Sequence, residues 1–396
     1  AEGKQDVAIA ANTMREIATG QMMRQTTSGS NLADLDFILP FEKYKITAGA
    51  KVSFTNTRNG INYDTSDPTL VQDDYFRYKE QIYALYADYS REFSERFSMQ
   101  LGLRMEHTRT TGISEAKDTE DKHDYTRLFP TVYLLYSPTD GHALNFSFSN
   151  RISRPSQNMV NPFPFYQNKY TYACGREDLK PSYTYNAELG YTLKNNFNVS
   201  AYYSYSDDVF FQVVDLDAET NVTSFLWENF MQTHAFGLNN SYTFRTKWLQ
   251  AYAQHGVSYR RTTSSAATTS PEEKGWAYDA SLRNTFFFNE KKTLLATLSG
   301  SYSSRQYQGI YLMSPTYSVS AGMLYRLLDN KLNLSLNVNN LFVSHSKLET
   351  MSNGLKIIAD NQFAFASFRI GVSYTFGGDI RSKGQRNSNE DIQRRL

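Results

Sequence analysis

Histidine, cysteine and acidic side chains are the groups in this chain that could catalyse a reaction or bind a metal. The six histidines show no His-x-x-x-His or comparable ligand spacing, and they are His107, His123, His142, His234, His255 and His345. Cys174 is the only cysteine, which excludes an intramolecular disulfide and a cysteine-rich zinc site. We therefore expect neither a bound metal nor another cofactor.

Adjacent polar residues, such as Asp73 with Asp74 and His123 with Asp124, could imitate a catalytic pair. Neighbouring acids in a loop are usually only solvated, and the sequence offers no third group that would orient a base. It also contains no GxSxG or Walker motif. We therefore predict that the chain is not an enzyme.

The segment 151–180 holds the side chains best suited to bind a ligand. Its aromatic residues could stack on a sugar or a peptide, and its arginines could meet an anionic ligand. In the alternative that we favour, the aromatic residues pack the long loop onto itself or lie at a membrane interface, and the arginines pair with acids. The candidate ligand-binding residues are Arg151, Arg154, Phe163, Tyr166, Tyr170 and Tyr172.

A strict alternation of apolar and polar residues indicates which elements carry these loops. In residues 332–339, LNLSLNVN, every second side chain is apolar, and residues 46–55 and 367–376 repeat the pattern. Successive side chains of a β-strand point to opposite faces. The period of two therefore predicts strands with one apolar face and one polar face.

Composition favours strands that cross a membrane over the alternative of an aromatic-rich soluble all-β protein. The mean hydropathy is −0.55, yet the chain has 29 Tyr and 26 Phe. No run approaches the roughly 18 apolar residues that a spanning helix needs. A polar lumen and aromatic residues at both interfaces are typical of an all-β, transmembrane antiparallel β-barrel. In such a barrel Leu334 and Phe368 should face lipid, and Ser335 and Arg369 should face the lumen.

The connections alternate between tight polar turns and long irregular stretches, which is the asymmetry of outer-membrane barrels. The short turns lie near residues 40–44, 92–96, 137–142, 194–196, 244–248, 289–292 and 328–331. The long stretches lie near residues 57–76, 110–124, 154–181, 206–221, 263–275, 305–315 and 344–362. We place the short turns in the periplasm and the long stretches outside the cell.

This map predicts about 15 strands within residues 31–376, the first near 31–39 and the last at 363–376. Bacterial single-chain barrels normally have an even number of strands, so residues 1–30 are interpreted as an extracellular loop or the remnant of a strand. Alternatively, residues 5–30 add one strand and give a complete barrel of about 16. Residues 377–396 are charged and lack aromatic residues, which predicts a disordered periplasmic tail.

Proline positions agree with the map except at Pro130, which lies within LFPTVYLLY. Proline cannot donate a hydrogen bond to a neighbouring strand. We therefore expect this strand to start after Pro130 or to be bulged there.

Residues 150–191 resemble the barrel of TonB-dependent receptors, especially the outer-membrane β-barrel family common in Bacteroidota. In that family an Arg-rich strand end is followed by an Asn-Pro-Phe loop and a Gly-Asn-Pro-x-Leu-Lys-Pro turn. The matching residues are Arg151, Arg154, Pro155, Asn161, Pro162, Phe163, Gly175, Leu179, Lys180 and Pro181. Arg176 and Glu177 replace the usual Asn-Pro, which puts the geometry of that turn in doubt.

The resemblance extends more weakly through residues 78–108 and 371–378, and it implies a 22-stranded barrel of which this chain forms the C-terminal part. The first strands and the plug domain would lie outside this chain, and a barrel of that width needs a plug. The acids with which we expect Arg151 and Arg154 to pair would belong to that plug. The implied partners are outer-membrane lipid, the missing N-terminal strands and plug, and TonB acting through the plug. A surface lipoprotein is a further candidate partner.

The leading functional hypothesis is the wall of a TonB-dependent receptor for active nutrient uptake in the outer membrane of a Gram-negative bacterium. The alternatives are a self-contained diffusion porin and a structural or adhesive surface barrel. The charges nearly balance, with 41 Lys and Arg against 40 Asp and Glu, so nucleic acid is not expected as a partner.

Overall fold

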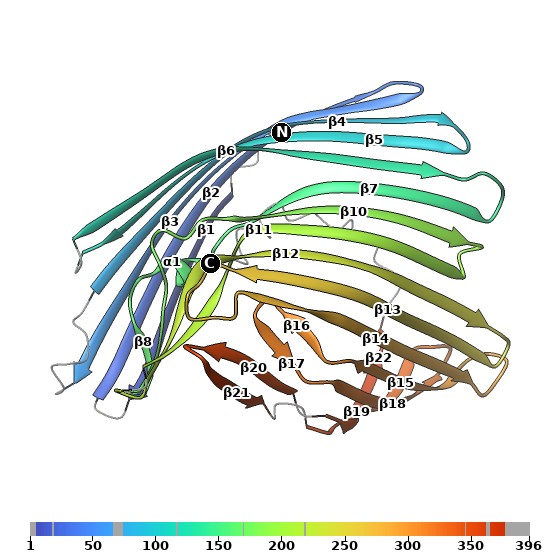
Figure 1. Ribbon diagram of the computed structural model, residues 1–396. Helices are drawn as coiled ribbons and strands as arrows, with labels where there is room; N and C mark the ends of the chain where they lie inside the picture. The colour runs from blue at the N-terminus through green and yellow to red at the C-terminus, as the bar shows by residue number, and fades with distance from the viewer. Residues whose placement is uncertain are drawn as a thin grey trace.

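One large curved sheet dominates the computed structural model, which describes residues 5–17, 20–65, 74–115, 118–168, 170–217, 219–344, 346–361 and 365–376. Sixteen long strands make up what we call the wall (Figure 1). They are β1 (Gln5–Ile17), β2 (Gly20–Pro40), β3 (Tyr44–Thr65), β4 (Asp74–Ser94), β5 (Phe97–Ser114), β6 (Thr119–Tyr136), β7 (His142–Ser153), β10 (Ser182–Leu193), β11 (Phe197–Asp217), β12 (Val222–Arg245), β13 (Leu249–Ser264), β14 (Glu272–Phe287), β15 (Leu294–Ser303), β18 (Thr316–Leu327), β19 (Leu332–Val343) and β22 (Ser367–Tyr374).

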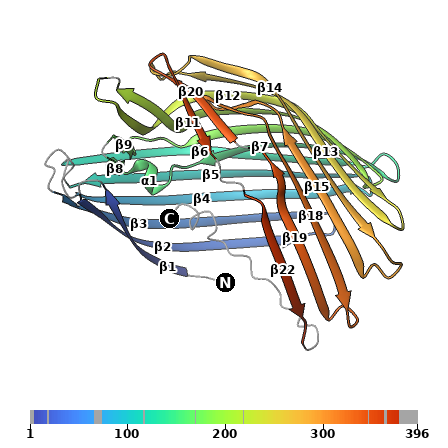
Figure 2. The same ribbon diagram turned by 90° about the horizontal axis from the view of Figure 1, so that it is seen from below.

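The wall is a meander, because each of its strands pairs antiparallel with the next one along the chain. It curls into a deep trough, and its concave face is called the lumen face below (Figure 2). Among the described residues no pairing joins β22 to β1, so both strands keep one free edge. The predicted antiparallel barrel strands are therefore confirmed, while this sheet does not close on itself.

The number of wall strands exceeds the expected 15 by one. Residues 5–17 form β1, and β2 begins at Gly20 and not near residue 31. The sequence had left open whether residues 5–30 hold a loop or another strand, and they hold strands. The last strand, expected at 363–376, is Ser367–Tyr374. The expected tail, 377–396, lies outside the described residues.

The outer face of the wall carries level rows of apolar side chains, because strand pairing keeps opposite residues on one face. One such row consists of Phe37, Ala48, Ala87, Leu103 and Pro130. On the outer face of β4, the residues from Phe93 to Tyr83 span about 34 Å along the strand and about 25 Å across the membrane at a tilt of roughly 40°. All of them are apolar or aromatic except Arg91, which lies over the Phe93 ring at the periplasmic end. This height matches the apolar band of an outer-membrane barrel.

The predicted faces of the C-terminal strands follow the same register. Leu334 is paired with Val372 and Val338 with Phe368, and Phe368 has 76% of its surface exposed. The intervening Ser335 is opposite Gly371, and the Ser335 hydroxyl donates to the Gly371 carbonyl (3.4 Å). The two faces are thus apolar and polar, as the alternation predicted.

All seven predicted short turns join consecutive wall strands, but several predicted long loops are wrong. Strand β3 continues to Thr65, β5 to Ser114 and β11 to Asp217. The ends of β3 and β5 carry mostly polar residues on both faces, because a strand that projects beyond the lipid no longer needs an apolar face. The end of β11 is apolar instead, and it packs against other segments at the extracellular end of the wall. The alternation that marks a membrane strand therefore fades before the strand ends.

Strand β6 runs through Pro130, contrary to the expected start after it. Pro130 is opposite Leu103 of β5, but the ladder between β6 and β7 ends at Thr131. Toward the extracellular end, β6 and β7 diverge. Proline is tolerated where one edge of a strand loses its partner, since no ladder hydrogen bond is required there.

Short elements lie at the extracellular end of the wall. They are α1 (Gln157–Val160), β8 (Phe165–Asn168), β9 (Thr171–Cys174), β16 (Gln306–Gln308), β17 (Tyr311–Met313), β20 (Ser346–Ser352) and β21 (Leu355–Asn361). The last four form a separate four-stranded sheet. In the described part of the chain no helix is long and apolar enough to cross a membrane.

Candidate functional site

The segment 154–181, called the inner loop below, folds onto the lumen face of the wall. The Gln157 side chain at the start of α1 donates a hydrogen bond to the Thr57 hydroxyl of β3. Within the loop, the Gly175 amide donates to the Asn161 carbonyl and the Arg176 amide to the Met159 carbonyl, both at 2.9 Å. The inner loop is therefore fixed both to itself and to the wall.

A small apolar cluster holds the inner loop in place. Val160 and Leu179 pack against Phe76 of β4, and these three side chains are between 1% and 5% exposed. Phe210 of β11 and Trp227 of β12 cover the same cluster. The loop thus lies between β4 and the extended hairpin of β11 and β12.

A short parallel pairing gives the inner loop a second attachment. Residues Thr171–Cys174 of β9 pair with residues 223–226 of β12. This part of β12 lies beyond the segment that β13 covers, which begins at Met231. The edge of β12 that would otherwise be exposed is therefore capped by the loop.

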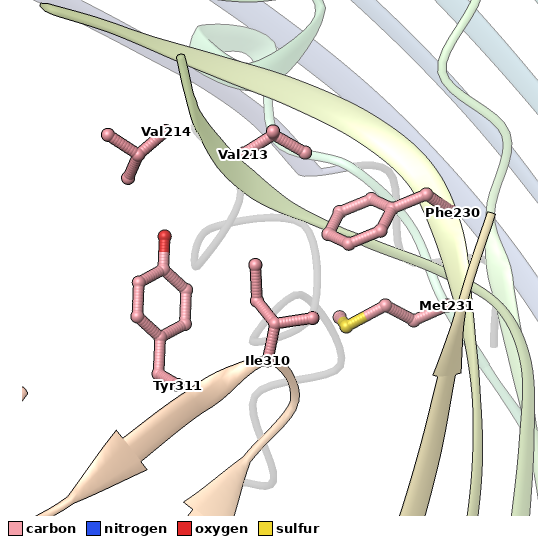
Figure 3. Close-up of a cluster of buried hydrophobic side chains, with 6 residues drawn as sticks. All are labelled: Val213, Val214, Phe230, Met231, Ile310 and Tyr311. Carbon is pink, nitrogen blue, oxygen red and sulfur yellow. The ribbon is translucent and has the colours of Figure 1, made fainter. Parts of the chain in front are cut away.

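The extracellular end of the β11–β12 hairpin is also covered by the four-stranded sheet. Val213, Val214, Phe230 and Met231 pack against Ile310 and Tyr311 (Figure 3). The Tyr311 hydroxyl donates to the Gln212 carbonyl (2.8 Å), and burial raises the pKa of Tyr311 to about 12. The hairpin is a central element, with the inner loop on one side and this sheet on the other.

Arg154, a candidate ligand-binding residue, forms an ion pair with an acidic side chain of the wall. Its guanidinium forms an ion pair with Glu106 and donates to the Thr108 hydroxyl (3.2 Å). Arg104 binds the other carboxylate oxygen of Glu106 (2.6 Å). The side chains of Arg154 and Glu106 are only 10% and 9% exposed. Arg154 therefore pairs with an acid of the wall, whereas the favoured partner was an acid of the plug.

The other five candidate residues are placed in four different settings. Phe163 is buried at 5% exposure, and Tyr170 is half exposed at 50%. Tyr166 and Tyr172 contact each other across β8 and β9, with ring centroids 5.4 Å apart. Arg151 is exposed on β7, opposite Thr184. Among the six candidates, Tyr166 and Tyr172 are therefore brought into direct ring contact.

A cavity of about 340 Å³ lies beside Arg154, where β6 diverges from β7. It is within the range of small-molecule sites, and it combines tyrosine rings with charges of both signs. Its lining residues are Tyr78, Glu80, Thr110, Lys122, His123, Asp124, Tyr125, Arg127, Arg154, Pro155, Leu179, Lys180, Pro181, Tyr183 and Asp208. At its edge the Arg127 guanidinium lies 4.8 Å from the centre of the Tyr183 ring.

Sequence reasoning identified only Arg154 among the candidate ligand residues of this cavity. Four more lining residues belong to the inner-loop motif described above, namely Pro155, Leu179, Lys180 and Pro181. The remaining ones come from β4, β5, β6, β10 and β11 and share no local motif. Within the described residues, no three His, Cys, Asp or Glu side chains converge as metal ligands. The cavity is suited to bind a polar organic ligand.

The turn at Arg176 should respond to acid. The hydrogen bonds from Arg176 (2.8 Å each) hold the pKa of Asp178 below its usual value, although burial opposes this shift. The resulting stability is complete above the ordinary pKa of about 4 and is lost as the pH falls through the lowered value. Hydrogen exchange of the Leu179 amide, corrected for its intrinsic rate, should therefore accelerate below about pH 4. Asp178→Asn should show no such acceleration, and identical pH profiles for both proteins would contradict the prediction.

The chain matches one family model over most of its length. The model is described as the outer membrane protein beta-barrel family, and it covers residues 6–374. A comparison with curated protein sequences finds no match.

Solved receptor structures share the fold at low identity. FecA, the ferric citrate transporter, has a TM-score of 0.64 at 13% identity, with 94% of this chain and 58% of FecA covered. FyuA, the ferric yersiniabactin uptake receptor from Yersinia pestis, has a TM-score of 0.63 at 14% identity, with 92% and 56% covered. PiuA, a siderophore receptor from Acinetobacter baumannii, has a TM-score of 0.58 at 13% identity, with 89% and 56% covered. The chain thus spans little more than half the length of these proteins.

Proposed function

Because the chain belongs to the outer membrane protein beta-barrel family, we propose that this outer-membrane protein forms the wall of a TonB-dependent transporter for nutrient uptake. The observation that carries the proposal is the open trough of sixteen strands, in which β1 and β22 each keep a free edge in the described residues. An unpaired edge in hydrocarbon costs several kcal/mol for each unsatisfied backbone group. Further strands are therefore needed to complete the wall.

A barrel completed in this way would have about 22 strands, and its lumen would be too wide for wall side chains to fill. It would require a plug domain, on which TonB would act from the periplasm. The covered lengths of FecA and FyuA, 58% and 56%, are consistent with a receptor that has more strands and a further domain. The Arg-rich segment at Arg151 and Arg154 supports the closer resemblance to receptors of Bacteroidota.

We also propose that ligand reaches the wall at the cavity beside Arg154. Tyr166, Tyr172 and Arg151 lie in or next to the inner loop that borders this cavity. Phe163 is buried and would position the loop without contacting the ligand, whereas Arg154 would both hold the loop through Glu106 and line the ligand cavity. A surface lipoprotein that delivers ligand remains compatible with the exposed position of Tyr170.

The main alternative is a diffusion porin, and channel recording separates the two. The natural gene product would carry an affinity tag in the exposed turn 289–292 and would be isolated from outer membranes for recording in planar lipid bilayers in KCl. A plugged transporter should give no steady conductance until urea displaces the plug. A channel that is open at rest, and that urea does not enlarge, would refute the proposal and favour the porin.

A further inference from the structure

The outer face of β3 to β6 carries a group of cations just beyond the apolar band. We call it the basic patch, and it consists of Arg58 of β3, Arg77 and Lys79 of β4, Arg109 of β5 and Lys122 of β6. These five residues lie on three successive rows of the sheet, because Arg58 is opposite Arg77, Lys79 and Lys122 are both opposite Thr111, and Arg109 is opposite Gln81. All of them share the outward face with Leu85 and Leu103.

The patch has more positive charge than its own acids balance. Asp124 pairs with Arg109 at 2.9 Å, and Glu120 pairs with Lys122 at 3.0 Å. For Arg58, Arg77 and Lys79, the described residues provide no ion pair. Like charges directly opposite each other on neighbouring strands are destabilising, so the Arg58 and Arg77 pair requires an anion from elsewhere.

A second cross-strand pair of cations in the same wall shows how such a conflict is resolved. Arg261 of β13 is directly opposite Lys274 of β14, one row beyond the aromatic pair Tyr259 and Trp276. The carboxylate of Glu272 contacts both cations, at 2.6 Å to Arg261 Nε and 2.5 Å to Lys274 Nζ. The chain therefore places its own anion between Arg261 and Lys274, whereas the described residues place none between Arg58 and Arg77.

The position of the basic patch along the membrane normal indicates which anion could lie between Arg58 and Arg77. Along the outer face of β4, Leu85 (57% exposed) and Tyr83 (36%) end the apolar band, and Lys79 and Arg77 follow. Lys79 is about 14 Å beyond Tyr83 along the strand, and about 10 Å along the membrane normal at a tilt of roughly 40°. This is the level of lipid headgroups in the outer leaflet.

We propose that the basic patch binds the phosphorylated headgroup of an outer-leaflet glycolipid. One phosphate would lie between Arg58 and Arg77, in the role that Glu272 has between Arg261 and Lys274, with Lys79 beside it. Arginine is well suited to this contact, because its guanidinium can donate two parallel hydrogen bonds to a phosphate. The acyl chains would lie against the apolar rows below.

The test uses the natural protein in detergent, with fluorescent lipid A as the probe. Arg58→Ser combined with Arg77→Ser should weaken lipid A binding by about tenfold or more, as expected for the loss of charge-assisted contacts to phosphate. Arg261→Ser combined with Lys274→Ser is the matched control, because it also removes two cations just beyond the aromatic belt, and it should change the affinity less than about twofold. Retained heat modifiability on gels would show that both variants are folded.

Two further arms distinguish a lipid from other anions. Dephosphorylated lipid A should bind the unaltered protein and the patch variant equally, and inorganic phosphate should not displace lipid A. Equal losses in the patch and control variants, or unchanged binding in both, would overturn the proposal. Displacement of lipid A by equimolar inorganic phosphate would assign the patch to a free anion and would also overturn it. None of these outcomes depends on whether the protein is a transporter.

Discussion

Arginine in place of Leu103 should destabilise the folded barrel by about 2–4 kcal/mol, the cost of a charge on the lipid face near the bilayer midplane. Leu103 is 51% exposed on the outer face and lies midway along the apolar band, between Ala87 and Pro130. Its neighbours across both strand pairs are apolar, so the arginine side chain would find no acid partner there. Urea titration of protein folded into lipid vesicles would measure the change.

Gln100→Arg is the matched control for Leu103→Arg. Gln100 is three residues away on the same strand but on the lumen face, opposite Ser90 and Tyr133. A charge there remains hydrated, so the free energy of unfolding should change by less than about 0.5 kcal/mol. Equal costs at both positions would show that the outer face of β5 does not contact lipid.

Glu106→Ala should release the inner loop, at a cost of about 3–5 kcal/mol for leaving a buried charge without its partner. Glu106 accepts from both Arg154 and Arg104, and removing the carboxylate leaves two guanidinium groups facing each other. The start of the loop should then leave the wall, because Arg154 is its first residue, and the rest of the loop should open more often even though α1 and β9 keep their own contacts. Trypsin should cleave after Arg176 much faster in the variant than in the unaltered protein, whereas Lys180 is protected in both because Pro181 follows it.

A double substitution separates this prediction from a general loss of folding. Glu106→Gln combined with Arg154→Met removes both charges, keeps similar volumes and should restore most of the resistance to trypsin, since a buried ion pair replaced by apolar groups is often neutral. Thr119→Ala removes only an exposed hydrogen bond between the end of β6 and Glu177, so it should leave the rate of cleavage nearly unchanged. Protection of the loop in Glu106→Ala would contradict the assigned role of the ion pair.

The sequence by itself determined the class of fold and the register of its faces. Alternation over residues 46–55 and 332–339 was sufficient, because lipid on one side and water on the other impose the same local rule on every strand. The tight turns were equally local: Lys194 and Asn195 have left-handed backbones, with φ of 48° and 55°, in a hairpin that joins β10 to β11.

Strand ends and strand number were determined less well, for a physical reason. Outside the apolar band, residues such as Asn56, Arg58 and Lys79 lie on strands whose outer face no longer contacts acyl chains, so the alternation no longer distinguishes strand from loop. Residues 5–17 form a strand with the same weak signal. The sequence left both a loop and a strand possible there, and only the pairing with β2 shows that these residues form a strand.

The tertiary structure alone decided what the inner loop does. Its contacts join residues far apart in the chain, as in Gln157 with Thr57 and Arg154 with Glu106, which are 100 and 48 positions apart. The cavity beside Arg154 takes its lining from five wall strands and the loop. The alternation along one strand predicts only the face of the sheet on which a side chain lies, because it compares residues of that strand alone. Which distant side chains meet depends on how the sheet curves and where β6 leaves β7, and this follows from the packing of the whole wall.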